Sequence, residues 1–138
     1  SGDLLMIGFD LVKDPGIIRN AYNDAQGITR EFNLNLLDRI NDELGANFKR
    51  EYFMHYPLYD VAEKQARSYI ISTKEQDVFI EETDQNYHFK AWEYIHTEIS
   101  QKYSREDIEH LASVSGFKHK KFLFDCKHYY TDVVWEKP

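Results

Sequence analysis

The stretch GFDLVKDPGIIRNAYNDAQGITREFNLNLLDRINDELGANF, residues 8–48, predicts the end of a strand followed by two helices. The strand begins in the apolar run at 4–9, LLMIGF. An unbroken apolar run is typical of a strand covered on both faces, as in a parallel α/β sheet. Asp14 and Pro15 then have the types expected of an N-cap and a first helical residue.

The two predicted helices are separated by a glycine and end at another. Gly27 interrupts the first helix, and a second helix runs from Thr29 to a stop at Gly45. Its apolar residues follow a helical spacing that predicts a buried stripe: Phe32, Leu36, Leu37, Ile40 and Leu44.

Three asparagines on the second helix need an explanation. Asn33, Asn35 and Asn41 each cost about a few tenths of a kcal/mol in helix propensity relative to alanine. Apolar periodicity does not account for them. Either the helix is poorly optimised, or these side chains make buried hydrogen bonds to neighbouring loops.

The remainder of the chain predicts mixed secondary structure. The segment at 50–60 is aromatic and irregular, 66–72 and 76–82 predict strands around a polar turn, and 87–100 continues as strand and loop. Ser104 and Asp107 have capping-box spacing ahead of a third helix, which ends at Gly116. The tail KHKKFLFDCKHYYTDVVWEK predicts a closing antiparallel hairpin.

Composition narrows the class of protein. A formal charge of −7 and a pI near 5.3 argue against a nucleic-acid binder, which needs a basic surface. A single cysteine, Cys126, allows no disulfide within the chain and suggests the reducing cytoplasm. No apolar run is long enough to predict a membrane span. The 15% aromatic content fits either a pocket wall or an aromatic core.

The candidate reactive residues give weak signals, apart from one pair. None of the six histidines has a helical metal-site spacing, and Cys126 with His128 lacks an orienting third group for nucleophilic catalysis. Glu98 and Ser100 are two apart, so their side chains share a face of an extended segment. Together they could bind a cationic or NH-bearing ligand, or form the solvent-facing edge of a strand.

Three segments carry a family resemblance: residues 8–48, IHTEISQKYS at 95–104 and LASVSGF at 111–117. In order and spacing they resemble the C-terminal half of the histidine-specific, S-adenosylmethionine-dependent methyltransferases, which include the histidine Nα-methyltransferase of the ergothioneine pathway. The resemblance runs over nearly the whole chain and is weakest at 49–66 and 80–94.

The resemblance implies an α/β fold, the C-terminal portion of a Rossmann-like methyltransferase core carrying an α+β substrate-binding insertion. Residues 1–14 and 101–138 would belong to the core, with 4–12 as its fifth strand. Residues 15–100 would form the insertion.

The resemblance also implies substrate-binding residues. The tyrosine of the family's AYxD motif falls on Tyr22, which would bind the amino-acid end of the substrate. The glutamate and serine of its TExSxKY motif fall on Glu98 and Ser100, which would hold an imidazole. A methionine that lines the imidazole side of the family's pocket falls on Ser68, and this departure puts histidine as the substrate in question.

The cofactor of the family is S-adenosylmethionine, but its binding motif is absent from this sequence. The 138 residues contain no glycine-rich loop after a strand and no matching acidic residue for the ribose. We therefore expect the chain to be the substrate-binding part of an N-methyltransferase for histidine or a related amino acid or amine, inactive by itself. The alternative is a non-catalytic small-molecule-binding or interaction domain, which could self-associate through an exposed sheet edge.

Overall fold

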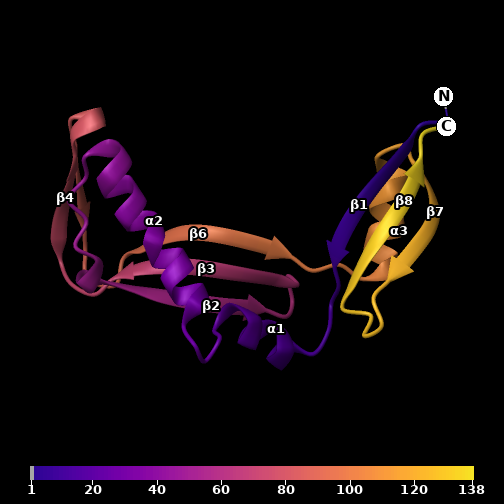
Figure 1. The fold of residues 1–138 in the computed structure, drawn as a ribbon, viewed down its shortest axis with the longest axis horizontal. Helices are drawn as coiled ribbons and strands as arrows, with labels where there is room; N and C mark the ends of the chain where they lie inside the picture. Colours follow the sequence, from indigo (N-terminus) through magenta and orange to yellow (C-terminus); the bar gives the residue numbers. More distant parts are fainter. Residues whose placement is uncertain (1) are drawn as a thin grey trace. The chain divides into compact units, whose positions relative to one another are not determined.

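The computed structural model describes residues 2–138, which divide into two compact units. One unit comprises the N-terminal segment up to Pro15, residues 61–65 and residues 100–138. The other comprises residues 16–60 and 66–99. The sheets and helices of each unit are drawn in Figure 1.

The first unit is a three-stranded antiparallel sheet covered by one helix. Its strand order is β1 (Leu4–Asp10), β8 (Tyr130–Glu136) and β7 (Lys118–Phe124). Helix α3 (Arg105–Val114) lies behind the sheet in Figure 1. Helix and sheet share one apolar core: Phe9, Leu11, Ile108, Ala112, Val133 and Trp135.

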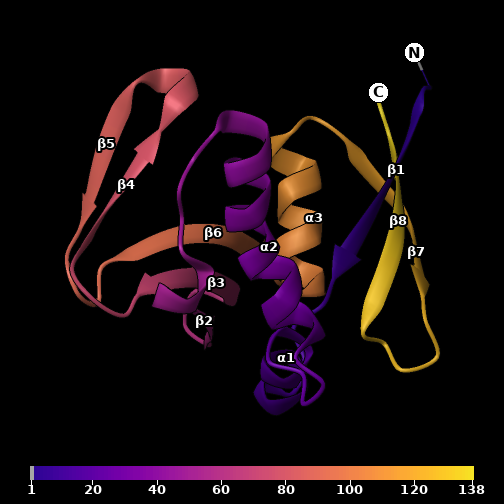
Figure 2. The same cartoon turned by 60° about the vertical axis from the view of Figure 1, so that its left-hand side comes forward.

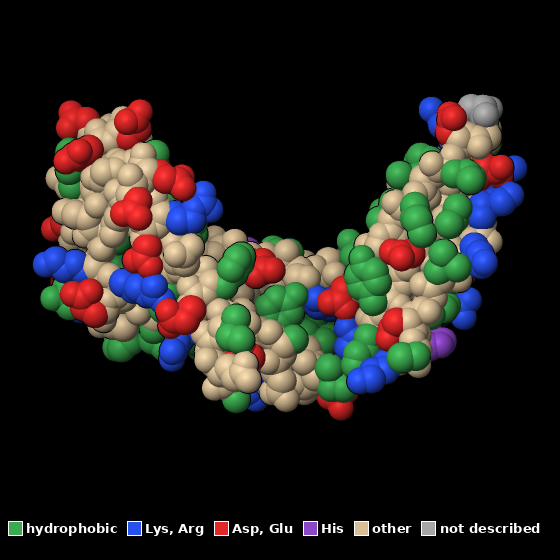
Figure 3. All heavy atoms as spheres, in the orientation of Figure 1, with side chains coloured by type: hydrophobic (Ala, Val, Ile, Leu, Met, Phe, Trp, Pro, Cys, Tyr) green, Lys and Arg blue, Asp and Glu red, His purple; other side chains and the backbone are tan. Residues whose placement is uncertain are grey.

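The expectation that the run at 4–9 is covered on both faces of a parallel sheet is wrong for the described chain. Strand β1 pairs antiparallel with β8, from Leu4 opposite Glu136 to Asp10 opposite Tyr130. Leu4 and Met6 are 67% and 60% exposed, and Figure 3 shows apolar side chains over β1. An apolar run indicates surface suited to burial, but the described elements cover only the end of the strand near Phe9.

The second unit places a long helix on a sheet. Strands β2 (Phe53–Asp60), β3 (Gln65–Ser72) and β6 (Tyr94–Gln101) form a three-stranded sheet in the order β2-β3-β6. Helix α1 (Pro15–Tyr22) precedes helix α2 (Ile28–Leu44), which crosses one face of this sheet in Figure 1. The unit's apolar core joins helix and sheet residues: Leu34, Leu37, Phe48, Phe53, Ile70 and Val78.

A separate hairpin completes the second unit. Strands β4 (Gln76–Ile80) and β5 (Gln85–Phe89) pair only with each other among the described strands, as Figure 2 shows. The short helical turns at 50–52 and 81–83 precede β2 and β5. The two strands predicted around the turn at 73–75 both exist, but they belong to different sheets.

The start of the first helix at Pro15 and both ends of the second helix are confirmed, but the first helix ends at Tyr22, before Gly27. The predicted stripe on α2 is partly wrong. Gly27 and Gly45 flank α2 with φ of 72° and 63°, the left-handed conformation that glycine adopts without strain. Leu37 is buried as expected, but Phe32 is 78% exposed and Leu34 is buried in its place. The buried face of α2 consists of Asn33, Leu34 and Leu37, so it includes a polar residue that a stripe of apolar residues leaves out.

Among the remaining secondary-structure predictions, some are confirmed and one is wrong. The capping box of Ser104 and Asp107 is present at the start of α3, and the tail forms the antiparallel β7–β8 hairpin. The segment predicted to be irregular at 50–60 is instead mostly strand β2. From the buried Phe53 onward, exposed residues (Met54, Tyr56 and Leu58) alternate with less exposed ones, which is the periodicity of a strand.

Candidate functional site

A pocket of about 240 Å³ opens between α2 and the three-stranded sheet of the second unit. Two of the predicted site residues, Ser68 on β3 and Glu98 on β6, line it together. Thr97 precedes Glu98 in the lining, and helix α2 supplies the remaining residues: Thr29, Phe32, Asn33, Asn35, Leu36 and Arg39.

Ser68 is part of the pocket lining and has a buried hydroxyl. The residue is 1% exposed, and its Oγ has no hydrogen-bond partner among the residues that the structure describes. Its main-chain carbonyl is occupied, because Thr97 Oγ1 donates to it over 3.0 Å. The side chain is therefore buried, polar and unpaired at the pocket wall.

The more exposed part of the lining also carries uncommitted groups. The Glu98 side chain is exposed, and within the described chain neither its carboxylate nor the Asn35 amide has a hydrogen-bond partner. Phe32 presents its ring at the same opening. Arg39 is already paired with Glu43 over 3.1 Å along the helix surface. The pocket thus offers a free carboxylate, an amide and an aromatic ring beside the buried Ser68 hydroxyl.

Asn33 holds the pocket wall in place. Its Nδ2 donates to the Tyr69 carbonyl over 3.2 Å and to His55 Nδ1 over 2.8 Å. Because His55 Nδ1 is then an acceptor, its Nε2 carries the proton that is donated to the Tyr22 carbonyl over 3.1 Å. This chain of bonds ties α2 to β3, β2 and the end of α1.

Asn41, like Asn33, makes hydrogen bonds from α2 to a neighbouring segment. Its amide donates to the Phe48 carbonyl and accepts from the Phe48 N–H, both over 2.8 Å. Asn33 and Asn41 therefore make hydrogen bonds that connect the helix to neighbouring segments. Asn35 is the exception, and it lines the pocket.

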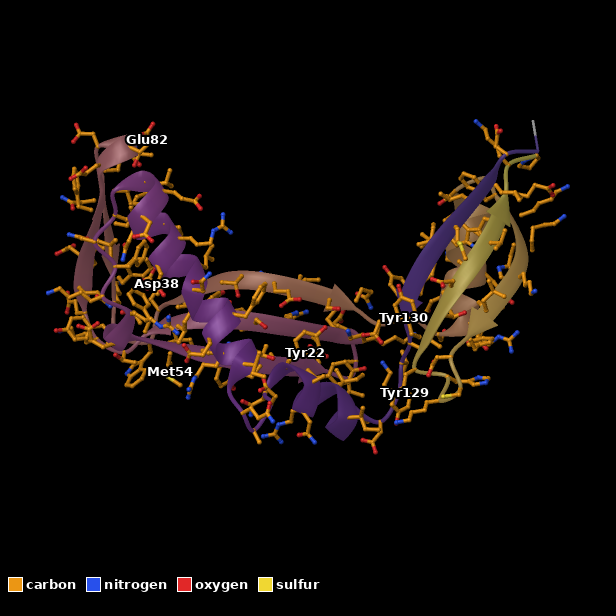
Figure 4. All side chains as sticks on the ribbon, in the orientation of Figure 1. Tyr22, Asp38, Met54, Glu82, Tyr129 and Tyr130 are labelled. Carbon is orange, nitrogen blue, oxygen red and sulfur yellow. The ribbon has the colours of Figure 1, made fainter. Side chains whose placement is uncertain are left out.

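Tyr22 and Ser100 lie outside the lining of this pocket. Tyr22 is the last residue of α1, where it is labelled in Figure 4, and it is half-buried. Ser100 belongs to the first unit. The structure thus brings Ser68 and Glu98 into one pocket and leaves the other two predicted residues outside it.

Ser100 is part of a buried charged cluster in the first unit. Lys102 is 1% exposed and donates from Nζ to Asp10 Oδ2 over 2.6 Å and to Ser100 Oγ over 2.8 Å. Lys13 also pairs with Asp10. Burial opposes ionisation of Asp10, but the hydrogen bonds and charges of Lys102 and Lys13 outweigh it, so the pKa of this carboxyl is lowered.

Sequence reasoning missed the role of Asp24. Its carboxylate accepts from the N–H groups of Ile28 and Thr29, each over 2.8 Å, at the start of α2. The pKa of Asp24 is lowered to about 2, first by a hydrogen bond from the Thr29 side chain and then by those from the Thr29 and Ile28 N–H groups. The sequence signal for this role was an aspartate shortly before Gly27, since aspartate is a preferred residue at the start of a helix.

Other candidate chemistry receives no support from the geometry. Residues 2–138 contain no group of three or more His, Cys, Asp and Glu side chains able to hold a metal ion. Cys126 and His128 lie in the turn between β7 and β8 and not on a strand. Among the described helices, none has the length and apolar character needed to cross a membrane.

Comparison with known proteins gives one family. The model of the histidine-specific, S-adenosylmethionine-dependent methyltransferases matches residues 1–137. Histidine N-alpha-methyltransferase of Mycolicibacterium smegmatis is 33% identical over 131 residues, which cover 95% of this chain and 39% of that protein. Its counterpart from Mycobacterium tuberculosis is 32% identical over 124 residues, covering 90% and 39%.

A fungal protein matches as well. Ergothioneine biosynthesis protein 1 of Neurospora crassa is 31% identical over 119 residues, which cover 84% of this chain and 13% of that protein. This chain spans about two-fifths of the length of the bacterial relatives. The family match over nearly all residues confirms the resemblance read from the three segments: the chain belongs to the histidine-specific, S-adenosylmethionine-dependent methyltransferase family.

Proposed function

We propose that this chain is the C-terminal, substrate-binding part of an S-adenosylmethionine-dependent N-methyltransferase that acts on histidine or a related amino acid or amine. The observation that carries the proposal is the pocket in which Glu98 and Ser68 present unpaired polar groups. Its volume of about 240 Å³ is small, below the roughly 300–1,000 Å³ typical of drug-sized ligands. A single amino-acid side chain suits such a space.

The residue roles follow from charge and position. Glu98 accepts hydrogen bonds from an N–H of the ligand's side chain, because a free carboxylate is a strong acceptor. Ser68 contributes a second polar contact in the same pocket. For Tyr22, as a contact to the amino-acid end, and for Ser100, as a further side-chain contact, the support is the family motif and not the pocket.

The fold assignment is part of the same proposal. The β1–β8–β7 sheet with α3 would belong to a Rossmann-like methyltransferase core, and residues 15–100 would be its substrate-binding insertion. The family match and the mixed α/β structure support this assignment.

The family's cofactor does not fit the residues of this chain. A Rossmann-like cofactor site uses a glycine-rich loop between a strand and a helix, and these 138 residues contain none. We therefore assign no contact to S-adenosylmethionine here. What this chain contributes is binding and orientation, which are large terms in a transfer that needs a neutral amine aligned with its reaction partner.

The test is a methyl-transfer assay on the full-length protein with a panel of amino acids and amines. Glu98→Ala should lower kcat/KM for the preferred substrate by about tenfold or more, because a charge-assisted hydrogen bond is lost. Glu82→Ala, which removes an exposed carboxylate from the turn at 81–83, is the control and should change little. Unchanged affinity and turnover in Glu98→Ala would refute the site.

A second candidate function is supported by the surface of β1. Leu4 and Met6 are exposed on a strand at the edge of the described sheet. Unpaired strand edges with apolar side chains favour pairing with another chain. A non-catalytic binding or interaction domain would bind the small molecule or self-associate without any methyl transfer, so ligand binding with no turnover on the full panel would favour it.

A further inference from the structure

A second pocket lies on the face of the β2–β3–β6 sheet that does not meet α2. Along β3 the buried residues alternate with less buried ones, and the less buried Tyr69 and Ile71 belong to this other face. The pocket has a volume of about 260 Å³, and all three strands contribute to its lining: Tyr56 and Leu58 from β2, Tyr69 and Ile71 from β3, and Tyr94 from β6. It shares no lining residue with the pocket of Ser68 and Glu98.

Three tyrosine rings give this pocket its character. The rings of Tyr69 and Tyr94 have centroids 5.2 Å apart and an interplanar angle of 85°, so they meet as two walls of a corner. His96 stacks on the Tyr69 ring with centroids 5.0 Å apart and an angle of 29°, which fixes the orientation of Tyr69. Tyr56 and Tyr94 are 47% and 63% exposed, so a ligand can reach both rings. The pocket is therefore an open aromatic corner beside two aliphatic side chains.

The charges around the pocket favour a cation of a particular kind. None of the described residues that line it is charged, and Arg67, two residues before Tyr69, is paired with Asp60 over 4.0 Å. The face of a tyrosine ring is the negative side of its quadrupole and attracts a cation. A primary ammonium would lose its hydrogen bonds to water here without gaining a carboxylate. A quaternary ammonium has no N–H group to lose, and its methyl groups can pack against Leu58 and Ile71.

We propose that this pocket is a second ligand site, which binds a quaternary ammonium group through the rings of Tyr56, Tyr69 and Tyr94. The inference goes beyond the proposed function, because the site shares no residue with the substrate pocket and needs no methyl transfer. Two kinds of compound carry this group: choline-type alcohols and N-trimethylated amino acids. The second kind arises when the amine of an amino acid is fully methylated, which would link the site to the proposed reaction.

The test compares choline with 3,3-dimethyl-1-butanol, in which a carbon atom replaces the charged nitrogen and the shape is kept. Binding of each compound to the full-length protein is measured by calorimetry. We expect choline to bind about tenfold or more tightly than the neutral compound, because the ring faces attract only the cation. Equal affinities would show an apolar pocket without charge recognition and overturn the proposal, as would the absence of choline binding.

Variants locate the choline site. Tyr94→Leu keeps an apolar side chain but removes a ring, so it should weaken choline binding by about three- to tenfold. Tyr87→Leu is the matched control and should keep the wild-type affinity, since Tyr87 is 42% exposed on β5 and lies outside the pocket. Glu98→Ala should keep it as well. Loss of choline binding in Glu98→Ala but not in Tyr94→Leu would place the ligand in the substrate pocket and overturn the proposal.

A third compound, N,N,N-trimethylglycine, distinguishes the two sources of the ligand. If it binds at least as tightly as choline and depends on Tyr94, the site is supported and takes N-trimethylated amino acids. If only choline binds in this way, the site is supported and takes choline-type compounds. Methyl transfer reports separately on the proposed function: transfer by a protein that binds no choline overturns the second site and leaves the enzyme standing, and Tyr94-dependent binding without transfer does the reverse.

Discussion

Lys102 in the first unit and Ser68 in the second are equally buried, at 1% exposure, yet their surroundings differ. Lys102 is bonded to Asp10 and Ser100 within its own unit. Ser68 Oγ has no partner in the part of the chain that the structure describes, and it faces a pocket. Burial alone therefore does not distinguish a structural polar group from a ligand-binding one. The presence of internal partners does.

The difference has an energetic meaning. Removing one member of a buried ion pair leaves the other charge desolvated and unpaired, which is costly. Removing a hydroxyl that has no bond costs little, because no interaction is lost. Substitution of Lys102 should therefore lower the free energy of unfolding more than substitution of Ser68 does. Ligand affinity should instead respond more to substitution of Ser68.

The largest effect is expected from Lys102→Met. The substitution removes two hydrogen bonds of a buried ammonium group but leaves Asp10, which is 38% exposed, paired with Lys13. It should lower the free energy of unfolding by about 2–3 kcal/mol, measured by chemical denaturation. Lys120→Met is the matched control, since Lys120 pairs with Glu136 over 3.0 Å with half of its side chain exposed. The control should cost less than about 1 kcal/mol. Equal losses would show that the Lys102 cluster is not structural.

The asparagines of α2 allow the same comparison on one helix. Asn41→Ala should lower the free energy of unfolding by about 2 kcal/mol, because it leaves the N–H and carbonyl of Phe48 without their partners. Asn35→Ala should stay within about 0.5 kcal/mol and weaken ligand binding instead. A large stability loss in Asn35→Ala would place it with the structural group.

Asp24 should make the stability of α2 depend on pH. Its folded pKa of about 2 lies below the ordinary value of 3.8, so its contribution is complete above pH 3.8 and is lost as the pH falls toward 2. The Tm difference between wild type and Asp24→Asn should be largest near pH 6 and shrink between about pH 4 and pH 2.

The control for Asp24 is Asp42→Asn, an exposed aspartate on the same helix. It should show no such convergence with the wild type over this pH range. A constant Tm difference for Asp24→Asn would indicate that the charge of Asp24 does not stabilise the helix start.

The smallest effect on stability is expected at Ser68. Ser68→Ala should change the free energy of unfolding by less than about 1 kcal/mol, because no hydrogen bond is lost. Ser72→Ala should cost about 1–2 kcal/mol, since its two bonds are broken. Calorimetric or chemical unfolding of the two variants measures this directly. A Ser68→Ala loss equal to that of Ser72→Ala would mean that Ser68 has an internal partner.

The predictable parts of the fold and site were those governed by local chemistry. The glycines around α2, the capping box of α3 and the tail hairpin follow from backbone conformation and short-range bonds. Glu98 and Ser100 stood out by spacing and family motif. The partner of Asn41, in contrast, lies seven residues away beyond the end of the helix, and the partners of Asn33 lie on other strands. No local pattern specifies such bonds.

The sequence by itself therefore determined the family, the helix ends and the residue types of the candidate site. Tertiary structure decided which of these residues meet: it placed Ser68 and Glu98 in one pocket and bonded Ser100 to Lys102. It also turned Leu34 toward the core and left Phe32 at the pocket opening. The physical reason is that conformation along the chain is set by near neighbours, whereas the pairing of a buried polar group depends on segments far away in the sequence.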